Sequence, residues 1–173
     1  SLHDALPIWN AEPFDLNNFD PSKLTIEMAA RQLSRLNRYN GNTKLPYTVA
    51  QHTVLGCQAL ILCGRVADAK AFFYHDHSEC IFPDLNPPTK VLIGQRWTDL
   101  EDGIQKRISD YRGVKFPFDP IIHTIDKNLA SFEISMMMKS KRSSDFDYWS
   151  EEKSYQQFIL MYDTIEELLA YEL

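Results

Sequence analysis

The chain has 173 residues, of which 44% are apolar and 24% charged, and this length and composition suit one ordinary soluble domain with room for a core. Its formal charge of −6 argues against a general affinity for the nucleic-acid backbone, although a few basic side chains in a pocket would suffice for a small anionic substrate. The three cysteines form no CxxC pair and no apolar run approaches a membrane span, so we expect a cytoplasmic protein with reduced thiols and no membrane partner.

The first eight residues read as the translation of one strand of a common sequencing adapter, and we set them aside from reasoning about the fold. On this interpretation the natural residues begin near Trp9, and residues 9–173 form a single domain. The pair His3-Asp4 inside the adapter-like segment is then given no role in chemistry.

Helix start signals and apolar spacing predict helices through the rest of the chain. Asp20-Pro21 and Asp119-Pro120 are typical helix starts, and Thr48 to Gln51 is a capping box. The expected helices cover about residues 21–36, 48–64, 66–79, 89–111, 121–138 and 150–173. No segment has the alternation or the β-branched density typical of a strand, so the expected fold is one all-α domain.

The segment Tyr-His-Asp-His-Ser-Glu, residues 74–79, combines groups that suit a metal-dependent hydrolase. On a helix that turns about 100° per residue, Asp76 lies about 100° from His75 and Glu79 about 40° from it, between the two. A nitrogen ligand and an oxygen ligand would then flank a carboxylate able to act on a water molecule. His77 falls about 200° from His75, on the far side, and is expected to be structural.

Further metal ligands must come from other helices, because such ions take about four to six ligands. His52 lies inside the expected second helix. Asp126 lies within an apolar helical stripe, where a carboxylate is costly unless it is paired or bound to metal. An ion pair with a nearby lysine is the alternative for Asp126. Glu133, two turns further along the same face, is a candidate to support a ligand from behind.

The order His52, then His75-Asp76, then Asp126 resembles that of the HD-domain metal-dependent phosphohydrolases. Residues 38–52 and 75–90 are similar to the corresponding segments of small bacterial 5′-deoxynucleotidases and of phage dNTP triphosphohydrolases. The resemblance covers roughly residues 14–138. It implies a single HD-domain helical bundle that holds one divalent cation (Co, Mn, Ni, Fe, Zn or Mg) through His52, His75, Asp76 and Asp126.

The resemblance also implies roles for side chains around the cation. Glu79 would orient or deprotonate the attacking water, and Asp84 would help to transfer a proton to the leaving group. Arg38 and Lys90 would bind phosphate, and Tyr39 would stack on the base or sugar. The structural alternatives are a helix-end charge for Arg38 and Glu79, and a turn residue for Asp84.

The implied activity is a 5′-deoxynucleotidase that releases phosphate from a dNMP, with a small-molecule nucleotide as partner. A dNTP triphosphohydrolase is the alternative, because it needs the same metal site. Cyclic-nucleotide phosphodiesterases and (p)ppGpp hydrolases of the family carry longer signatures than this chain shows. From another class, a non-catalytic nucleotide-binding module stays open. The relatives also suggest a homo-oligomer, formed through the helix after Lys90 or the C-terminal helix.

Overall fold

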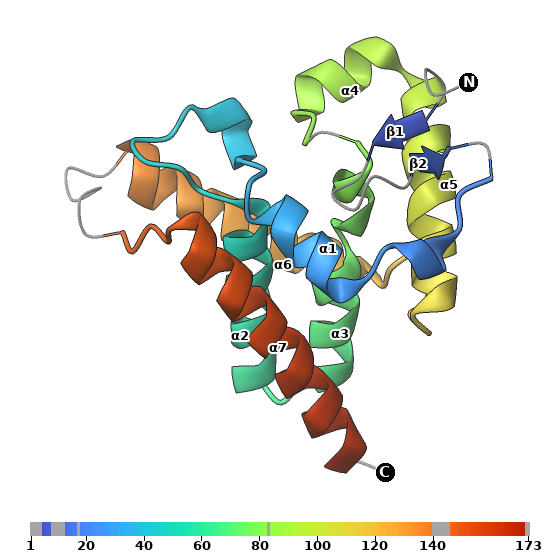
Figure 1. Cartoon of the computed structure of the whole chain (residues 1–173). Coiled ribbons are helices and arrows are strands. Elements are labelled where there is room, and N and C mark those ends of the chain that lie inside the picture. The colour runs from blue at the N-terminus through green and yellow to red at the C-terminus, as the bar shows by residue number, and fades with distance from the viewer. Residues whose placement is uncertain (1–4, 8–12, 17, 83, 140–145, 172–173) are drawn as a thin grey trace.

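Helices make up most of the protein. The structure is a computed structural model that describes residues 5–7, 13–16, 18–82, 84–139 and 146–171 (Figure 1). The α-helices in this part are α1 (Ile26–Leu33), α2 (Val49–Leu62), α3 (Val66–Tyr74), α4 (Pro87–Ile93), α5 (Gln95–Tyr111), α6 (Pro120–Ile134) and α7 (Glu151–Tyr171). Short 3₁₀ segments lie at Pro21–Lys23, Arg38–Gly41 and His77–Cys80, and a π-helical turn, Ser135–Lys139, follows α6. The predicted all-α fold is confirmed.

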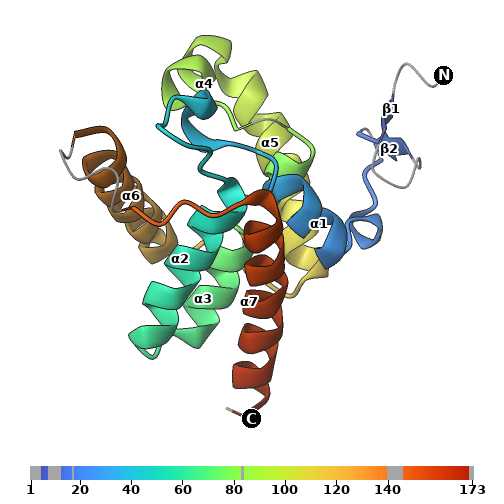
Figure 2. The same cartoon turned by 60° about the vertical axis from the view of Figure 1, so that its left-hand side comes forward.

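Two short strands precede the helices. β1 (Ala5–Pro7) and β2 (Pro13–Asp15) pair antiparallel. No strand was expected here, since three residues are too few to show an alternating pattern. β1 falls within the adapter-like segment, whose exclusion from the natural chain stays a prediction. Figure 2 shows the strands beside the helical bundle and not within it.

The bundle is organised around α2. Helices α3 and α7 pack along it, α1 packs against α7, and α6 contacts both α2 and α3. Both views place α2, α3 and α7 side by side, with α4 and α5 at the opposite end of the molecule (Figures 1 and 2). The buried residues of α2 occupy most of its circumference: Val49, Ala50, Gln51, His52, Thr53, Val54, Gly56, Cys57 and Leu60. A helix surrounded in this way is the natural place to hold a buried polar site rigidly.

The capping signals locate several helix ends as predicted. The Thr48 hydroxyl accepts a hydrogen bond from the backbone N–H of Gln51 at 3.1 Å, so the capping residue is where the sequence indicated. Gly64, with φ +69°, follows the end of α2. Asp119 caps α6 by accepting from the backbone N–H of Ile121 at 3.0 Å. His52 on α2 and Asp126 on α6 therefore lie on helices whose first turns are capped.

Other predicted helices were wrong in their extent. The helix expected over residues 66–79 ends at Tyr74, and the chain turns before the next 3₁₀ segment. The helix expected over residues 89–111 is two helices, because Gly94 has φ 80° and ψ −160°, a region that favours glycine. The start predicted at Asp20 caps only a 3₁₀ turn, and α1 begins instead after Thr25, whose side chain accepts from the Met28 N–H.

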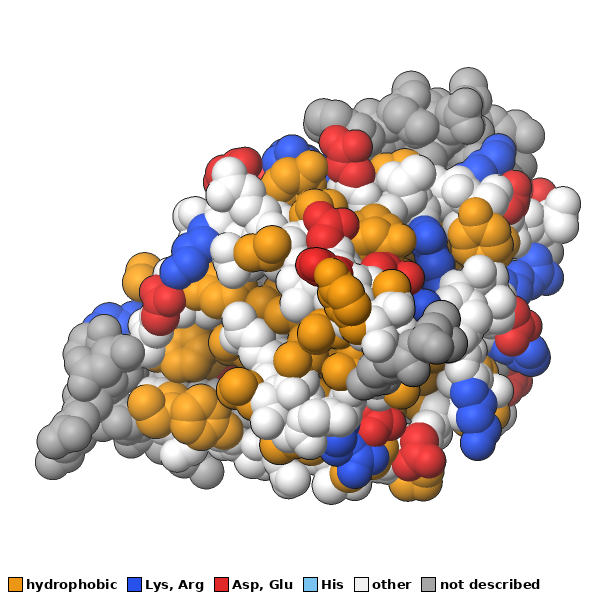
Figure 3. Space-filling model, turned by 90° about the horizontal axis from the view of Figure 1, so that it is seen from below, with side chains coloured by type: hydrophobic (Ala, Val, Ile, Leu, Met, Phe, Trp, Pro, Cys, Tyr) orange, Lys and Arg blue, Asp and Glu red, His pale blue; other side chains and the backbone are white. Residues whose placement is uncertain are grey.

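No helix in the described ranges combines the length and the apolar content needed to cross a bilayer. The surface carries several large apolar side chains that are exposed: Leu62, Val91, Leu92, Ile93, Leu100 and Leu160 among them. On the face towards which the lower ends of α2, α3 and α7 point, apolar groups are spread among charged ones (Figure 3). The expected homo-oligomer stays a prediction.

Gly56 lies at the contact between α2 and α3, where the structure leaves no space for a Cβ atom. A Cβ added at Gly56 would lie 2.1 Å from Cε1 of Phe72. We predict that Gly56→Ala lowers the free energy of unfolding by about 1–3 kcal/mol through overpacking, despite the better helix propensity of alanine. Urea denaturation would measure the change.

The matched control is Gly103→Ala in α5. A Cβ there meets nothing within 4 Å, so this variant should gain up to about 1 kcal/mol from helix propensity alone. Equal effects of the two substitutions would contradict the proposed close approach of α2 and α3.

Candidate metal centre

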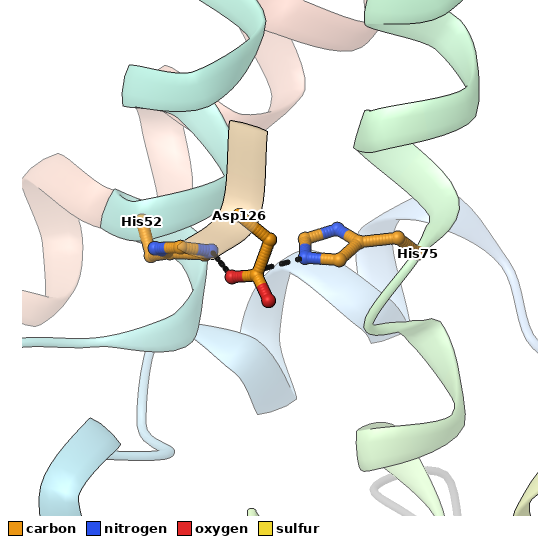
Figure 4. A group of neighbouring side chains, drawn as sticks. All are labelled: His52, His75 and Asp126. Carbon is orange, nitrogen blue, oxygen red and sulfur yellow. Dashed lines mark ion pairs between the residues drawn. The ribbon is translucent and has the colours of Figure 1, made fainter. Parts of the chain in front are cut away.

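Three helices bring two histidines and one aspartate to a common point. His52 lies on α2, His75 follows the end of α3, and Asp126 lies on α6. Their ligand atoms all lie within 4.8 Å of one another, so this group can hold a metal ion. Asp126 Oδ1 is 3.1 Å from His52 Nε2 and 4.0 Å from His75 Nε2. Figure 4 shows the carboxylate of Asp126 between the two imidazole rings.

The atoms that face this point have no hydrogen-bond partner. His52 Nε2, His75 Nε2 and Asp126 Oδ1 are buried polar atoms left without one. Buried polar atoms are nearly always paired, so three such atoms converging on one point require an explanation. A divalent cation would satisfy all three at once, and a mixed nitrogen and oxygen donor set suits Mn, Fe, Co, Ni or Zn. The residues present therefore fit the expected metal.

His75 is oriented by Phe72, one turn earlier on α3. Its Nδ1 lies 2.6 Å from the Phe72 carbonyl oxygen, and its ring stacks on the Phe72 ring with centroids 4.2 Å apart. Nδ1 must donate to that carbonyl, which leaves Nε2 free to ligate. Burial lowers the pKa of His75 against the opposing charges of Asp76 and Asp126, and this favours the neutral form that binds metals.

His52 is oriented by a buried carboxylate. Its Nδ1 lies 2.7 Å from Glu133 Oε1, and both side chains are completely buried. Glu133 also accepts hydrogen bonds from the hydroxyls of Tyr47 at 2.6 Å and Tyr39 at 2.5 Å. Burial raises the pKa of Glu133, but the hydrogen bond and charge of His52 and the charge of Arg38 lower it overall to about 2. Glu133 is thus ionised, in the supporting place that the sequence suggested.

Asp76 lies beside the group of three and is not part of it. Its Oδ2 is 3.2 Å from His75 Nε2 and 3.4 Å from Nη1 of Arg38. Nη2 of Arg38 lies 3.7 Å from Asp126 Oδ1. Burial opposes the charge of Arg38, but the carboxylates of Asp76 and Glu133 outweigh it and raise its pKa. The guanidinium therefore sits as a permanent cation among these acids.

A cavity of about 530 Å³ opens onto the centre, a size within the roughly 300–1,000 Å³ of small-molecule sites. Its lining consists of Arg38, His75, Asp76, Glu79, Asp84, Leu85, Pro87, Lys90, Val91, Phe118, Asp119, Ile122, His123 and Asp126. Most of the residues predicted from sequence thus share one cavity. His52 lies buried behind it, and Tyr39, predicted to stack on the substrate, is not among the lining residues and instead bonds to Glu133.

Two carboxyl groups in the cavity have raised pKa values. Burial raises the pKa of Glu79 well above its usual value, and the charges of Asp76 and Asp84 raise it further. Burial also raises the pKa of Asp84, against the charges of Arg38 and Lys90. Oε2 of Glu79 is buried without a hydrogen-bond partner. Carboxyl groups that keep a proton to a higher pH are suited to acid–base chemistry.

The second predicted phosphate-binding cation is already paired. Lys90 Nζ donates to both carboxylate oxygens of Glu101, at 2.8 and 3.0 Å. Lys90 lines the main cavity and also an adjoining one of about 190 Å³, in which Glu101 and Asp102 take part. A phosphate group reaching Lys90 would therefore compete with Glu101 for its ammonium.

Gln105, a buried residue of α5, was not predicted from the sequence. Its Nε2 donates to the Tyr74 carbonyl at 2.8 Å, and its Oε1 accepts from the Ser78 N–H at 3.0 Å. It thereby holds both ends of the turn that contains His75 and Asp76. The available signal was a polar residue beside Ile104 on the buried stripe of α5. Tyr47 was also missed, and nothing in the spacing of its neighbours pointed to it.

The two other histidines of the predicted region differ in setting. His77 is 1% exposed and packs against the rings of Tyr74 and Phe158, away from the metal group, as expected of a structural residue. Burial lowers the pKa of His77 to about 3. His123 was expected to have a surface role; it is exposed and also lines the cavity.

Comparison with known proteins adds no identification. No protein-family model matches the chain, and no curated protein is significantly similar to it. The function must therefore be argued from the geometry of the site.

The metal centre makes a direct prediction for Asp126→Ala. Mn²⁺ or Co²⁺ should bind the unaltered protein and stabilise it, by about 2.7 kcal/mol when the free ion is at 100 times its Kd. The variant should lose most of this stabilisation, because it removes the oxygen that lies between the two histidines. Thermal unfolding with and without metal would measure the effect.

The control for this prediction is Asp163→Ala, at an exposed position of α7. It should keep the metal-dependent shift in full. An Asp126→Ala protein that is stabilised by metal as strongly as the unaltered chain would contradict the assignment of the centre.

Proposed function

We propose that the protein is a metal-dependent phosphohydrolase of the HD-domain type, with a deoxynucleoside 5′-monophosphate as its substrate. One observation carries the proposal: the unpartnered atoms of His52, His75 and Asp126 converge beside a cavity that also contains acid–base candidates and two cations. The sequence resemblance to 5′-deoxynucleotidases supports the same interpretation.

In this proposal Asp76 is the fourth ligand. Its Oδ2 lies 3.2 Å from His75 Nε2, so a small shift would bring it to the same ion. A bound divalent cation lowers the pKa of a water molecule and polarises a phosphoryl oxygen. Arg38 then balances the remaining negative charge of Asp76 and Asp126, which it already faces at 3.4 and 3.7 Å.

The carboxyl groups of the cavity supply proton transfer. Oε2 of Glu79, buried and unpartnered, takes the proton of the attacking water. Asp84 gives a proton to the departing 5′ oxygen of the nucleoside, and burial, which raises its pKa, favours the protonated form that this role needs. The step requires Glu79 to start deprotonated and Asp84 to start protonated. Burial and the neighbouring negative charges raise the pKa of Glu79, and a bound divalent cation, by offsetting those charges, would favour its deprotonated form.

The nucleoside has an apolar wall to lie against. Leu85, Val91, Phe118 and Ile122 line the cavity together with the charged groups. A base and a deoxyribose ring could bury apolar surface on this wall while the phosphate reaches the metal centre. A substrate with one polar end and one largely apolar end fits this division.

The charges of the cavity favour one phosphate over three. The two cations in its lining, Arg38 and Lys90, are each held by carboxylates. Against them stand Asp76, Glu79, Asp84, Asp119 and Asp126. A triphosphate would bring several more negative charges into this acidic surrounding. A dNTP triphosphohydrolase is the second candidate, because the adjoining cavity of about 190 Å³ gives space beyond Lys90.

The test is a phosphate-release screen of the purified protein. It compares dNMPs, NMPs and dNTPs with Co²⁺, Mn²⁺, Mg²⁺ and EDTA, using Asp76→Ala as the blank. Inorganic phosphate from dNMPs, abolished by EDTA and in the variant, is the expected result. Triphosphate plus nucleoside from a dNTP would move the assignment to the second candidate. Metal binding without turnover of any nucleotide would favour a non-catalytic binding module.

Glu79→Gln should separate chemistry from metal binding. Loss of the proton acceptor is expected to lower kcat by about 10²- to 10⁴-fold. The affinity for Mn²⁺ should stay unchanged, because Glu79 is not one of the three convergent ligands. The exposed Glu167→Gln on α7 is the matched control. A Glu79→Gln protein with full kcat would exclude the proposed proton transfer.

A further inference from the structure

We propose that Glu133 is the positioning residue of the metal centre: it fixes the tautomer and the ring orientation of His52, and Tyr47 and Tyr39 hold its carboxylate for that purpose. This inference rests on the metal centre of the proposed function, and it concerns a residue outside the cavity lining. Glu133 is completely buried and is not among the residues that line the substrate cavity.

The tautomer follows from the identity of the partner. Nδ1 of His52 lies 2.7 Å from Oε1 of Glu133, and an ionised carboxylate can only accept hydrogen bonds. Nδ1 must therefore carry a proton, so that in a metal complex, where the ring is neutral, the lone pair lies on Nε2. That nitrogen is the one 3.1 Å from Asp126 Oδ1, the oxygen that faces it in the metal group, and it makes no hydrogen bond.

The carboxylate itself is prevented from rotating. Oε1 accepts from the Tyr47 hydroxyl at 2.6 Å, and Oε2 accepts from the Tyr39 hydroxyl at 2.5 Å. Rotation about the last bond of Glu133 would break both of these bonds and the one to His52. Each carboxylate oxygen of Glu133 is thus held by a tyrosine hydroxyl, and the orientation of the oxygen that accepts from His52 is fixed.

The chain order makes Glu133 and Asp126 a rigid pair. Both lie on α6, two turns apart, so one helix supplies a ligand and also the group that aims another ligand. Contact between α6 and α2 then fixes His52 relative to Asp126. The relative position of His52 and Asp126 is therefore as rigid as the packing of α2 against α6.

Tyr39 reaches Glu133 from an unusual backbone. Tyr39 and Asn40 have φ of 58° and 52°, values that are uncommon and energetically costly for residues other than glycine. Such a conformation persists where surrounding contacts impose it, and the bond from the Tyr39 hydroxyl to Glu133 is one such contact. The loop that carries Arg38 to the cavity is therefore tied to the same carboxylate.

A purely structural role as the counter-charge of Arg38 is the competing explanation. Arg38 Nε lies 3.6 Å from Glu133 Oε2, which is longer than the 2.7 Å to His52, and Nε has no hydrogen-bond partner. Arg38 also has Asp76 at 3.4 Å and Asp126 at 3.7 Å. The geometry therefore assigns Glu133 first to His52.

The first test measures metal affinity in Glu133→Gln. Calorimetric titration of the metal-free protein with Co²⁺, with the visible absorption of the bound ion as a second readout, should show affinity reduced by about 10- to 100-fold. Tyr47→Phe removes one of the two hydroxyls that hold the carboxylate, and a smaller loss is expected. This milder variant keeps the test valid if Glu133→Gln does not fold. Glu167→Gln, on the surface of α7, should bind as the unaltered protein does.

The second test reads the tautomer directly. In the Zn²⁺-loaded protein, long-range ¹H–¹⁵N correlation should show His52 ligating through Nε2 with a protonated Nδ1. Ligation through Nδ1 would overturn the proposal. A folded Glu133→Gln protein with unchanged Co²⁺ affinity and spectrum would also overturn it and leave only a structural role.

These outcomes are separable from those of the proposed function. Metal binding weakened in Glu133→Gln, with no phosphate released by the unaltered protein, would support the positioning role and refute the hydrolase. Phosphate release together with unchanged affinity in Glu133→Gln would do the reverse. An unaltered protein that binds no divalent ion would overturn both.

Discussion

The burial of Glu133 is the constraint on which the site depends. An ionised carboxylate removed from water costs several kcal/mol unless hydrogen bonds and opposite charges compensate for it. The compensating groups are His52 on α2, Tyr47 just before α2, and Arg38 and Tyr39 in the loop between α1 and α2. Since these groups must all reach α6 at once, the carboxylate fixes the loop, the central helix and α6 relative to one another. The metal group lies where these segments meet.

A second constraint is the end of α3 at Tyr74, where the helix stops and the chain turns. Gln105 satisfies the Tyr74 carbonyl and the Ser78 N–H, two backbone groups that would bond to each other in a continuous helix. Because the helix stops there, the angular positions of Asp76 and Glu79 around a regular helix do not apply. Both nevertheless line the cavity with His75. The three side chains therefore share a cavity although they do not share a regular helix.

Much of the site could be predicted because the signals were local. The capping box at Thr48 located the helix of His52, and the apolar neighbours of Asp126 marked it as a carboxylate that needs a partner. The features that escaped prediction depend on distances between segments: Tyr39 directed at Glu133, Gln105 across from Tyr74, and Lys90 paired with Glu101. Side-chain hydrogen bonds over such separations leave no periodicity in the sequence, whereas caps and apolar stripes do.

The charge of the cavity gives the cation a second task in the proposed function. Asp76, Glu79, Asp84 and Asp126 surround the place where a phosphate would sit, and the neighbouring cations are already engaged with carboxylates. An anionic substrate entering this surrounding is repelled unless positive charge is added, since at short range and partial burial each charge pair is worth several kcal/mol. The same ion that activates water would thus also make the cavity attractive to phosphate. The raised pKa of Asp84 acts in the same direction, because a protonated carboxyl repels the phosphate less and can donate a proton to it.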